Sequence, residues 1–181
     1  LSRGEMVRFD AQTRRFTSFL PDISAETVSY SRDGAWMAYI KLGELWRSRT
    51  DGSERLQLTF RPRGVGDPTW SPDGKQIAFT GQLSGTRSQI FTISANGGTP
   101  DLVVSDSEPS TPTWSPDGKS LASGSCDWGF HRGLDWPRPP TRGPERSEWR
   151  LWDISTGKNL RMESETGRLL SLAFAPSGKS L

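Results

Sequence analysis

The 181-residue sequence predicts an all-β fold made of short strands and tight turns. Three observations predict it: the composition, an aromatic-to-glycine segment that recurs four times, and a second hairpin pattern between these segments. Apolar residues make up only 32% of the chain, alongside 19 glycines, 13 prolines and 8 tryptophans. This mixture is typical of many strands that each add one large aromatic to a shared core, not of helices with leucine and alanine at a 3.6-residue spacing.

The aromatic-to-glycine segment predicts a repeated structural unit. Its aromatics lie 40, 44 and 60 residues apart, counted from 30 to 70, 70 to 114 and 114 to 174. The first two spacings match a four-stranded propeller blade of roughly 40–45 residues, and the third requires an insertion. The aromatic, aspartate and glycine residues of the four copies are Tyr30, Asp33 and Gly34; Trp70, Asp73 and Gly74; Trp114, Asp117 and Gly118; and Phe174 and Gly178.

Each copy has the residues of a tight turn between two strands. In the second copy, Ser71 accepts a backbone hydrogen bond, the proline fixes φ near about −65°, and Gly74 supplies the positive φ that lets the next strand leave. The following strands alternate between large and small side chains. We expect one face to pack into the core and the small face to let a neighbouring sheet approach, with Met37, Tyr39, Ile77, Phe79 and Leu121 on the first face and Ala38, Ala78 and Ala122 on the second.

The repeated aspartates and tryptophans also suggest two functional alternatives, a metal-binding ring and a set of ligand-stacking residues. Equivalent positions on successive blades point the same way but lie far apart around a ring. We therefore interpret both sets as parts of the architecture, and expect function where the repeats differ.

A second hairpin follows each of the first three copies. Asp51-Gly52 and Asn96-Gly97 are strong hairpin signals, and the third hairpin turns near Gly157. The opening residues fit the same hairpin, with the first half of their blade absent. The predicted units are a half blade at 4–20, full blades at 27–60, 67–105 and 111–164, and a partial blade at 170–181.

Stacked blades bury their faces only against one another. The sequence therefore predicts a partial β-propeller of four-stranded antiparallel blades, three full blades with half blades at each end, as part of a larger ring. Closure into four blades, with the first half blade pairing with the last, is the alternative.

An insertion at 128–149 explains the long third spacing. Its prolines exclude a regular strand or helix and predict a loop. Loops on rigid scaffolds often carry function, so this is our candidate interaction loop; the alternatives are an excursion without a role, or tryptophans that cover the edge of a neighbouring blade. Its candidate contact residues are Trp128, Phe130, His131, Arg132, Trp136 and Arg138.

The repeat resembles that of the TolB-type (PD40) propellers. The resemblance rests on the Trp-Ser-Pro-Asp-Gly-Lys motif at 70–75, the Ile-Ala-Phe strand at 77–79 and the Gly-Gly-Thr-Pro turn at 97–100. Together with the WD40-like segments further on, it covers nearly the whole chain outside the insertion and implies the propeller fold. Residues 45–60 also look like propeller repeats found behind bacterial winged-helix regulators or serine/threonine kinases.

The third blade is similar to WD40 repeats. In that family a histidine, a serine or threonine, an aspartate and a tryptophan form a structural hydrogen-bond network. Asp127, Trp152 and a serine among 123–125 match it in type, whereas no Gly-His pair precedes the blade and the insertion separates Asp127 from Trp152.

Charge, hydropathy and residue types exclude several function classes. A net charge of +2 with scattered basic residues argues against nucleic acid as a partner. No apolar stretch reaches the roughly 18 residues of a membrane helix, so direct membrane insertion of this segment is not expected. A single cysteine, Cys126, excludes an internal disulfide.

Catalytic and cofactor signatures are also missing from the sequence. His131 is the only histidine, no G-x-S-x-G elbow occurs, and one cysteine with one histidine cannot form a structural zinc site. The Gly-Lys-Ser segments at 118–120 and 178–180 lack the earlier glycine of a phosphate-binding loop. We expect no cofactor, no metal and no enzyme activity in this segment.

The resulting functional hypothesis is a non-catalytic scaffold that binds protein partners or senses, within a larger bacterial protein. The main alternative is a regulatory or substrate-gating propeller of an enzyme, either a prolyl-oligopeptidase-like hydrolase or a serine/threonine kinase, with its catalytic domain outside this segment. Binding of a carbohydrate or small ligand in the central channel is a third hypothesis. We expect a periplasmic or other extracytoplasmic location in preference to the cytoplasm.

Overall fold

The computed structural model describes residues 5–60, 63–82, 88–105, 110–126, 146–167, 169, 171–178, 180 and 181. This described part contains strands and turns but no helix. The strands form a two-stranded hairpin followed by three four-stranded sheets, all antiparallel. The all-β prediction is therefore confirmed.

The sheets follow the order of the sequence without crossovers, since each sheet pairs consecutive strands. We call the sheet of β3–β6 the first blade, that of β7–β10 the second and that of β11–β14 the third. The strands are β1 (Val7–Asp10), β2 (Arg15–Ser18), β3 (Val28–Tyr30), β4 (Trp36–Lys41), β5 (Glu44–Arg49), β6 (Leu56–Gln57), β7 (Arg63–Trp70), β8 (Gln76–Gln82), β9 (Gln89–Ser94), β10 (Asp101–Val104), β11 (Ser110–Trp114), β12 (Ser120–Cys126), β13 (Arg146–Asp153) and β14 (Asn159–Thr166).

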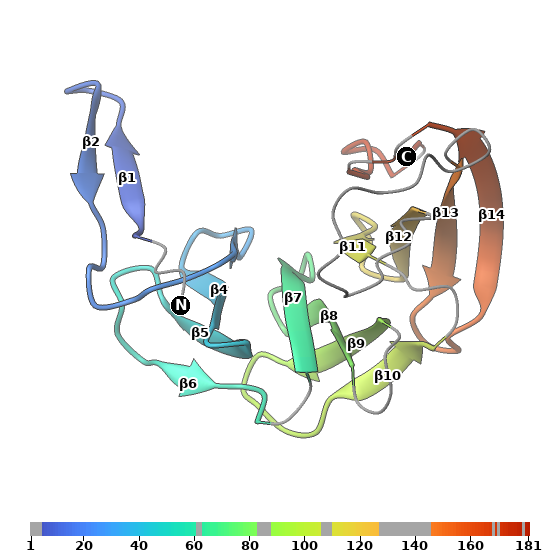
Figure 1. The fold of residues 1–181 in the computed structure, drawn as a ribbon, viewed down its shortest axis with the longest axis horizontal. Helices are drawn as coiled ribbons and strands as arrows, with labels where there is room; N and C mark the ends of the chain where they lie inside the picture. Colours follow the sequence, from blue (N-terminus) through green and yellow to red (C-terminus); the bar gives the residue numbers. More distant parts are fainter. Residues whose placement is uncertain are drawn as a thin grey trace, which may run out of the picture.

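The blades stand side by side in an open arc (Figure 1). The first strand of a blade lies toward the inside of the arc, and β6, β10 and β14 lie on its outer side. The β1–β2 hairpin and the third blade lie at opposite ends of the arc and do not meet. The chain thus has the partial propeller fold that the sequence predicts, open rather than closed into four blades.

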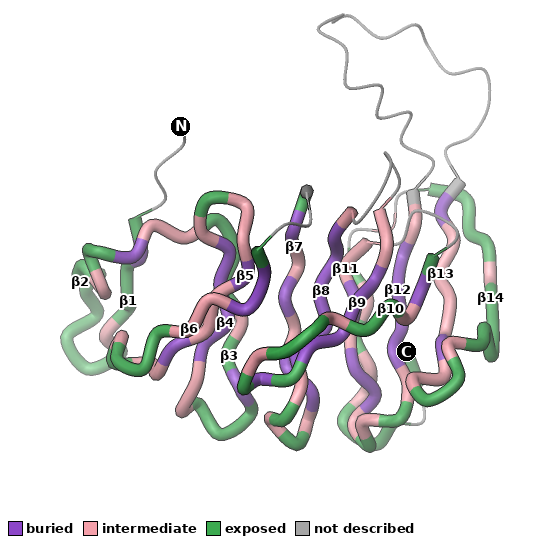
Figure 2. The backbone as a smooth tube through the Cα atoms, turned by 90° about the horizontal axis from the view of Figure 1, so that it is seen from below, coloured by how far each residue is buried: buried purple, intermediate pink, exposed green. Residues whose placement is uncertain are grey.

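The arc has two edges with different contents (Figure 2). One edge, which we call the turn edge, holds the turns between the first and second strands of each blade and those between the third and fourth strands. The opposite edge, the loop edge, holds the connections between second and third strands, such as Leu42-Gly43 between β4 and β5. The connections from β8 to β9 and from β12 to β13 start and end at this loop edge.

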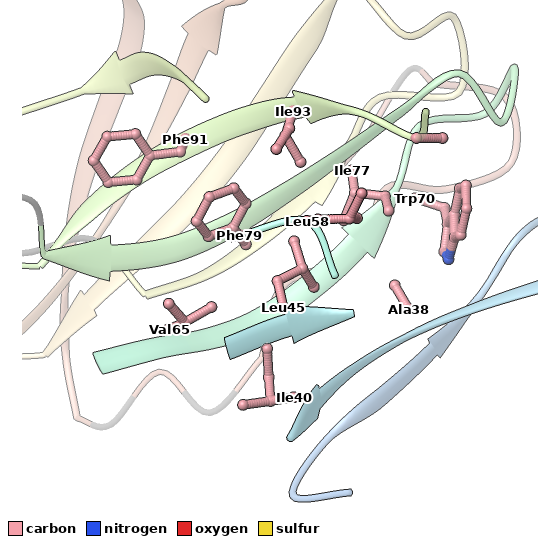
Figure 3. Packing of buried hydrophobic residues seen from close by; sticks show 11 residues of the cluster. Ala38, Ile40, Leu45, Leu58, Val65, Trp70, Ile77, Phe79, Phe91 and Ile93 are labelled. Atoms are coloured by element: carbon pink, nitrogen blue, oxygen red, sulfur yellow. The ribbon is translucent and has the colours of Figure 1, made fainter. Parts of the chain in front are cut away.

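The hydrophobic core lies between the blades, because both faces of each central strand are covered. Ala38 on the first blade belongs to the same buried cluster as Ile77 and Phe79 on the second (Figure 3). Phe79 stacks on Phe91, its partner across the β8–β9 ladder, with ring centroids 5.6 Å apart. In the same way, Ala78 on the second blade clusters with Leu121 on the third.

The alternation of large and small residues explains this close stacking. A blade's large face packs on the small face of the preceding blade, which lets the two sheets approach closely. Tyr39, whose pKa is raised by burial, and Met37 pack instead against Met6 and Ile23 from the segments around the N-terminal hairpin.

Three boundaries differ from the sequence-based units. The strand β7 begins at Arg63, before the expected start of the second blade at 67. The strand β13 begins at Arg146, so the last four residues of the expected insertion at 128–149 extend a strand. They pair with β12 and β14. The prolines of the insertion lie before residue 146, so they gave no indication of where this pairing begins. The described residues of the expected partial blade at 170–181 contain a turn but no strand.

Candidate functional site

The first three aromatic-to-glycine turns share one hydrogen-bond network. In the second copy, the Ser71 hydroxyl donates to the Asp73 carboxylate at 2.7 Å and accepts the backbone N–H of Gln76 at 2.9 Å. The same carboxylate accepts the backbone N–H of Lys75 at 3.1 Å. The Ser71 hydroxyl, followed by the Lys75 N–H, lowers the pKa of Asp73. The carboxylate is thus held within the turn.

The other copies repeat this arrangement. Asp33 and Asp117 accept hydrogen bonds from Ser31 and Ser115 in the same way, and their pKa values are lowered for the same reason. In the fourth copy Ala175 replaces the serine, yet its N–H still donates to the Ser180 carbonyl at 2.9 Å. Gly34, Gly74, Gly118 and Gly178 all have positive φ values between 69° and 71°. The backbone turn therefore recurs four times, even where the side-chain network does not.

The repeated tryptophans connect neighbouring blades. The indole N–H of Trp70 donates to the Ser29 carbonyl of the first blade, and that of Trp114 donates to the Thr69 carbonyl of the second, each at 3.2 Å. Both tryptophans are only 7% exposed. Tyr30, the equivalent residue of the first blade, is 51% exposed, since no inner strand precedes it. Phe174 in the fourth copy has no N–H to donate.

Trp152 makes a further buried bond within the third blade. Its indole N–H donates to the Ser123 hydroxyl at 2.9 Å, which is one contact of the WD40-type network suggested by the sequence. Asp127, the expected acidic member of that network, lies outside the described residues.

The candidate interaction loop stays a prediction. Its residues Trp128, Phe130, His131, Arg132, Trp136 and Arg138 all lie outside the described residues. The strands that flank them, β12 and β13, place both ends of the connection at the loop edge. Within the described ranges there is no group of three metal-ligating side chains and no helix that could cross a membrane.

A groove of about 510 Å³ opens between the second and third blades, on the turn edge. One wall is β10, and the other is the turn between β13 and β14. At their contact the two walls are close, because a Cβ on Gly157 would lie 3.0 Å from the Val103 carbonyl oxygen. The lining residues are Gln76, Thr92, Asp101, Leu102, Val103, Ser105, Ile154, Ser155, Thr156 and Gly157.

Strand registry identifies the residues of the first blade that are equivalent to the groove floor. Trp36 begins β4 as Gln76 begins β8. Arg47 lies opposite Ala38 as Thr92 lies opposite Ala78. Across the next ladder, Leu56 and Asp101 are the matching residues.

These positions hold large side chains in the first blade. The guanidinium of Arg47 lies 4.1 Å from the ring centroid of Trp36, and that of Arg49 lies at the same distance. Trp36 and Leu56 pack on the cluster between the first two blades. Burial lowers the pKa of Arg47, which nevertheless stays charged because guanidinium groups do not titrate in proteins. The same space is filled at one blade boundary and open at the next.

Sequence reasoning missed the groove because it looked for differences between the repeats in the insertion at 128–149 and not position by position along the strands. The usable signal was the set of positions where aligned repeats differ most in size, such as Trp36 against Gln76. Finding those positions required the register between strands, which the sequence did not provide.

Comparisons with known proteins support the fold. The structure is similar to TolB from Acinetobacter baumannii, with a TM-score of 0.68 and 21% identity over 98% of this chain and 42% of that one. It is also similar to a putative TolB from Agrobacterium tumefaciens, with a TM-score of 0.64 and 23% identity over 87% of this chain and 52% of that one. The chain thus spans about half the length of these proteins or less, and its fold is that of a TolB-type β-propeller.

One curated protein is similar in sequence. An uncharacterized peptidase, YuxL of Bacillus subtilis, is 30% identical over 86 residues, which are 42% of this chain and 13% of that protein. No known family profile matches the chain.

Proposed function

We propose that this propeller is a non-catalytic scaffold that binds protein partners, or senses through them, as part of a larger bacterial protein. One observation carries the proposal: the polar groups that recur between repeats are used to build the repeat. Ser71 and Asp73 hold a turn, and Trp114 connects two blades. The repeats differ in the connections at the loop edge and in the spaces between blades. Variable segments held by a rigid scaffold are common sites of partner recognition.

The proposal includes an extracytoplasmic location, such as the periplasm, for which the likeness to TolB proteins is the support. Fractionation of cells that express the complete polypeptide tests this part. We expect the protein in the extracytoplasmic fraction, and recovery with cytoplasmic markers would contradict it.

Site-specific photocrosslinking tests the scaffold proposal. A photoreactive phenylalanine analogue replaces Leu42, which lies at the loop edge and is 77% exposed. A matched variant carries it at Arg32, an exposed residue on the turn edge. In living cells, with the complete polypeptide, we expect a defined crosslinked partner at position 42 and not at position 32. Absence of protein adducts at both positions would contradict the proposal.

A second candidate function is a regulatory or substrate-gating propeller attached to a hydrolase. The sequence likeness to a peptidase over 86 residues favours it. Its test is labelling of the complete polypeptide with a fluorophosphonate probe for activated serines. Labelling outside residues 1–181 would favour this function, and no labelling of a folded, complete protein would count against it. Attachment to a serine/threonine kinase, the other form of this alternative, is tested by autophosphorylation with ATP.

A further inference from the structure

We propose that the groove between the second and third blades binds the guanidinium group of an arginine in an extended segment of a partner protein. This inference rests on the proposed function as a protein-binding scaffold and names the chemistry of one partner. It follows from the comparison of two equivalent spaces within the same chain.

The first blade boundary shows that this space accommodates a guanidinium. There the side chain of Arg47 occupies it, 4.1 Å from the Trp36 ring. At the second boundary Thr92 replaces Arg47 and Gln76 replaces Trp36, and a groove of about 510 Å³ remains. The fold therefore offers a volume that its own arginine fills one repeat earlier.

The groove floor presents hydrogen-bond acceptors that the chain does not use. The Asp101 carboxylate, the Gln76 carboxamide and the Thr92 hydroxyl make no side-chain hydrogen bond with the described part of the chain. Asp101 and Thr92 are direct partners across the β9–β10 ladder, so they share a face. Thr92 is only 4% exposed, which makes a hydrogen bond to its hydroxyl valuable because few waters reach it.

The charge of the lining favours a cation. Asp101 is the only charged side chain among the ten lining residues. A guanidinium offers five N–H donors in a planar fork that matches a carboxylate. Asp101 is exposed, so beside a neutral ligand its carboxylate stays hydrated and adds no attraction, whereas an anion would be repelled by it.

The walls suit the rest of an arginine side chain. The hydroxyls of Ser155 and Thr156 both donate to Asp153, at 2.7 Å and 2.9 Å, so toward the groove they act as acceptors. Val103 and Ile154, which pack on the cluster between the second and third blades, offer apolar surface to the methylene groups.

The position of β10 favours a peptide over a free small molecule. This strand is the outermost of its blade and pairs only with β9 among the described strands. Its other side therefore presents backbone N–H and carbonyl groups that an extended segment can pair with. A partner can thus combine backbone pairing along β10 with one arginine inserted into the groove.

Isothermal titration of the complete polypeptide with blocked peptides tests the proposal. The probes are a Val-Arg-Val tripeptide with acetyl and amide ends and the same tripeptide with citrulline, which keeps the shape of arginine without its charge. We expect binding of the arginine peptide at least tenfold tighter than that of the citrulline peptide, and weakening as salt is raised.

Two variants locate the binding. Asp101→Asn should weaken binding of the arginine peptide at least tenfold, and Thr92→Arg should abolish it by placing an arginine where the first blade has one. Glu165→Gln, which removes an exposed carboxylate from β14 outside the groove, is the matched control and should leave binding unchanged. Melting temperatures of all variants verify folding.

Three results would overturn the inference: no binding of the arginine peptide, equal binding of the citrulline peptide, or binding that survives both groove variants. Binding of a neutral oligosaccharide at the groove in place of the peptide would also overturn it. None of these results affects the crosslinking at position 42, so failure of this inference and failure of the scaffold proposal are distinguishable.

Discussion

Two indole N–H groups link the second and third blades to the blade before them. Trp70 donates to the Ser29 carbonyl and Trp114 to the Thr69 carbonyl, and these two carbonyls occupy equivalent positions in their blades. A buried carbonyl without a donor costs free energy, so these tryptophans contribute a polar contact as well as apolar area. The serine and aspartate side chains of the turns are likewise hydrogen-bonded within the fold. The repeated polar residues of this chain therefore have structural roles.

The substitution Trp70→Phe isolates the indole hydrogen bond. It should lower the free energy of unfolding by about 1 kcal/mol more than a Trp→Phe change that removes buried apolar area but no hydrogen bond. Trp46→Phe is the control, since no hydrogen bond of its indole is found in the described part of the chain. Urea denaturation measures both variants, and equal effects would argue against the role assigned to the bond.

The turn aspartates predict a loss of stability in acid. The folded pKa values of Asp33, Asp73 and Asp117 are lowered, chiefly by the serine hydroxyls, from the ordinary value of 3.8. Their contribution is therefore present above the unfolded pKa and is lost as the pH falls through the folded values. The midpoint of urea denaturation, measured at a series of pH values from neutral downward, should fall once the pH is below about 4.

The matched comparison is the triple variant with all three aspartates replaced by asparagine. Its midpoint should depend less on pH over the same range, because the asparagine side chain can still accept the hydrogen bonds but does not titrate. A variant that followed the wild-type pH profile would show that other carboxylates dominate acid unfolding.

At the scale of the element, the two turn types of each blade meet different neighbours. A Cβ on Gly34 would touch nothing within 4 Å, whereas a Cβ on Gly157 would lie 3.0 Å from the Val103 carbonyl oxygen. Both glycines have positive φ, 69° and 66°. The second turn of the third blade thus needs glycine for two reasons, its own conformation and the close approach to the second blade.

The pair of variants Gly34→Ala and Gly157→Ala separates these two reasons. Positive φ alone should cost about 1 kcal/mol in each. The contact with Val103 should make Gly157→Ala the more destabilising of the two by about a further 1 kcal/mol, because the backbone on both sides must shift. Equal losses in thermal or chemical denaturation would show that the third blade moves away without cost.

The elements that the sequence predicts well are those with local causes. The turn at 70–74 and the strand of Ile77 and Phe79 follow from residues that are neighbours in the chain. The start of β13 at Arg146 and the groove above Thr92 were not predictable in this way, because both depend on which residues face one another across strands. The equivalence of Trp36 and Gln76 becomes visible only with that register.

For the whole molecule, protection from exchange should follow the burial between blades. The central strands β8 and β9 are buried on both faces, while β14 and the β1–β2 hairpin are mostly exposed. In the 181-residue chain, hydrogen–deuterium exchange should be slowest in β8 and β9 and fastest in the hairpin. Uniform protection along the chain would indicate contacts that the open arc does not have.

The account as a whole depends on successive blades that stack through the same contacts. An experimental structure of the complete polypeptide tests this most directly. We expect the indole nitrogens of Trp70 and Trp114 within hydrogen-bond distance of the carbonyl oxygens of Ser29 and Thr69, with the four aromatic-to-glycine segments at equivalent corners of adjacent sheets. Blades that meet through other residues, or helices in place of these sheets, would contradict it.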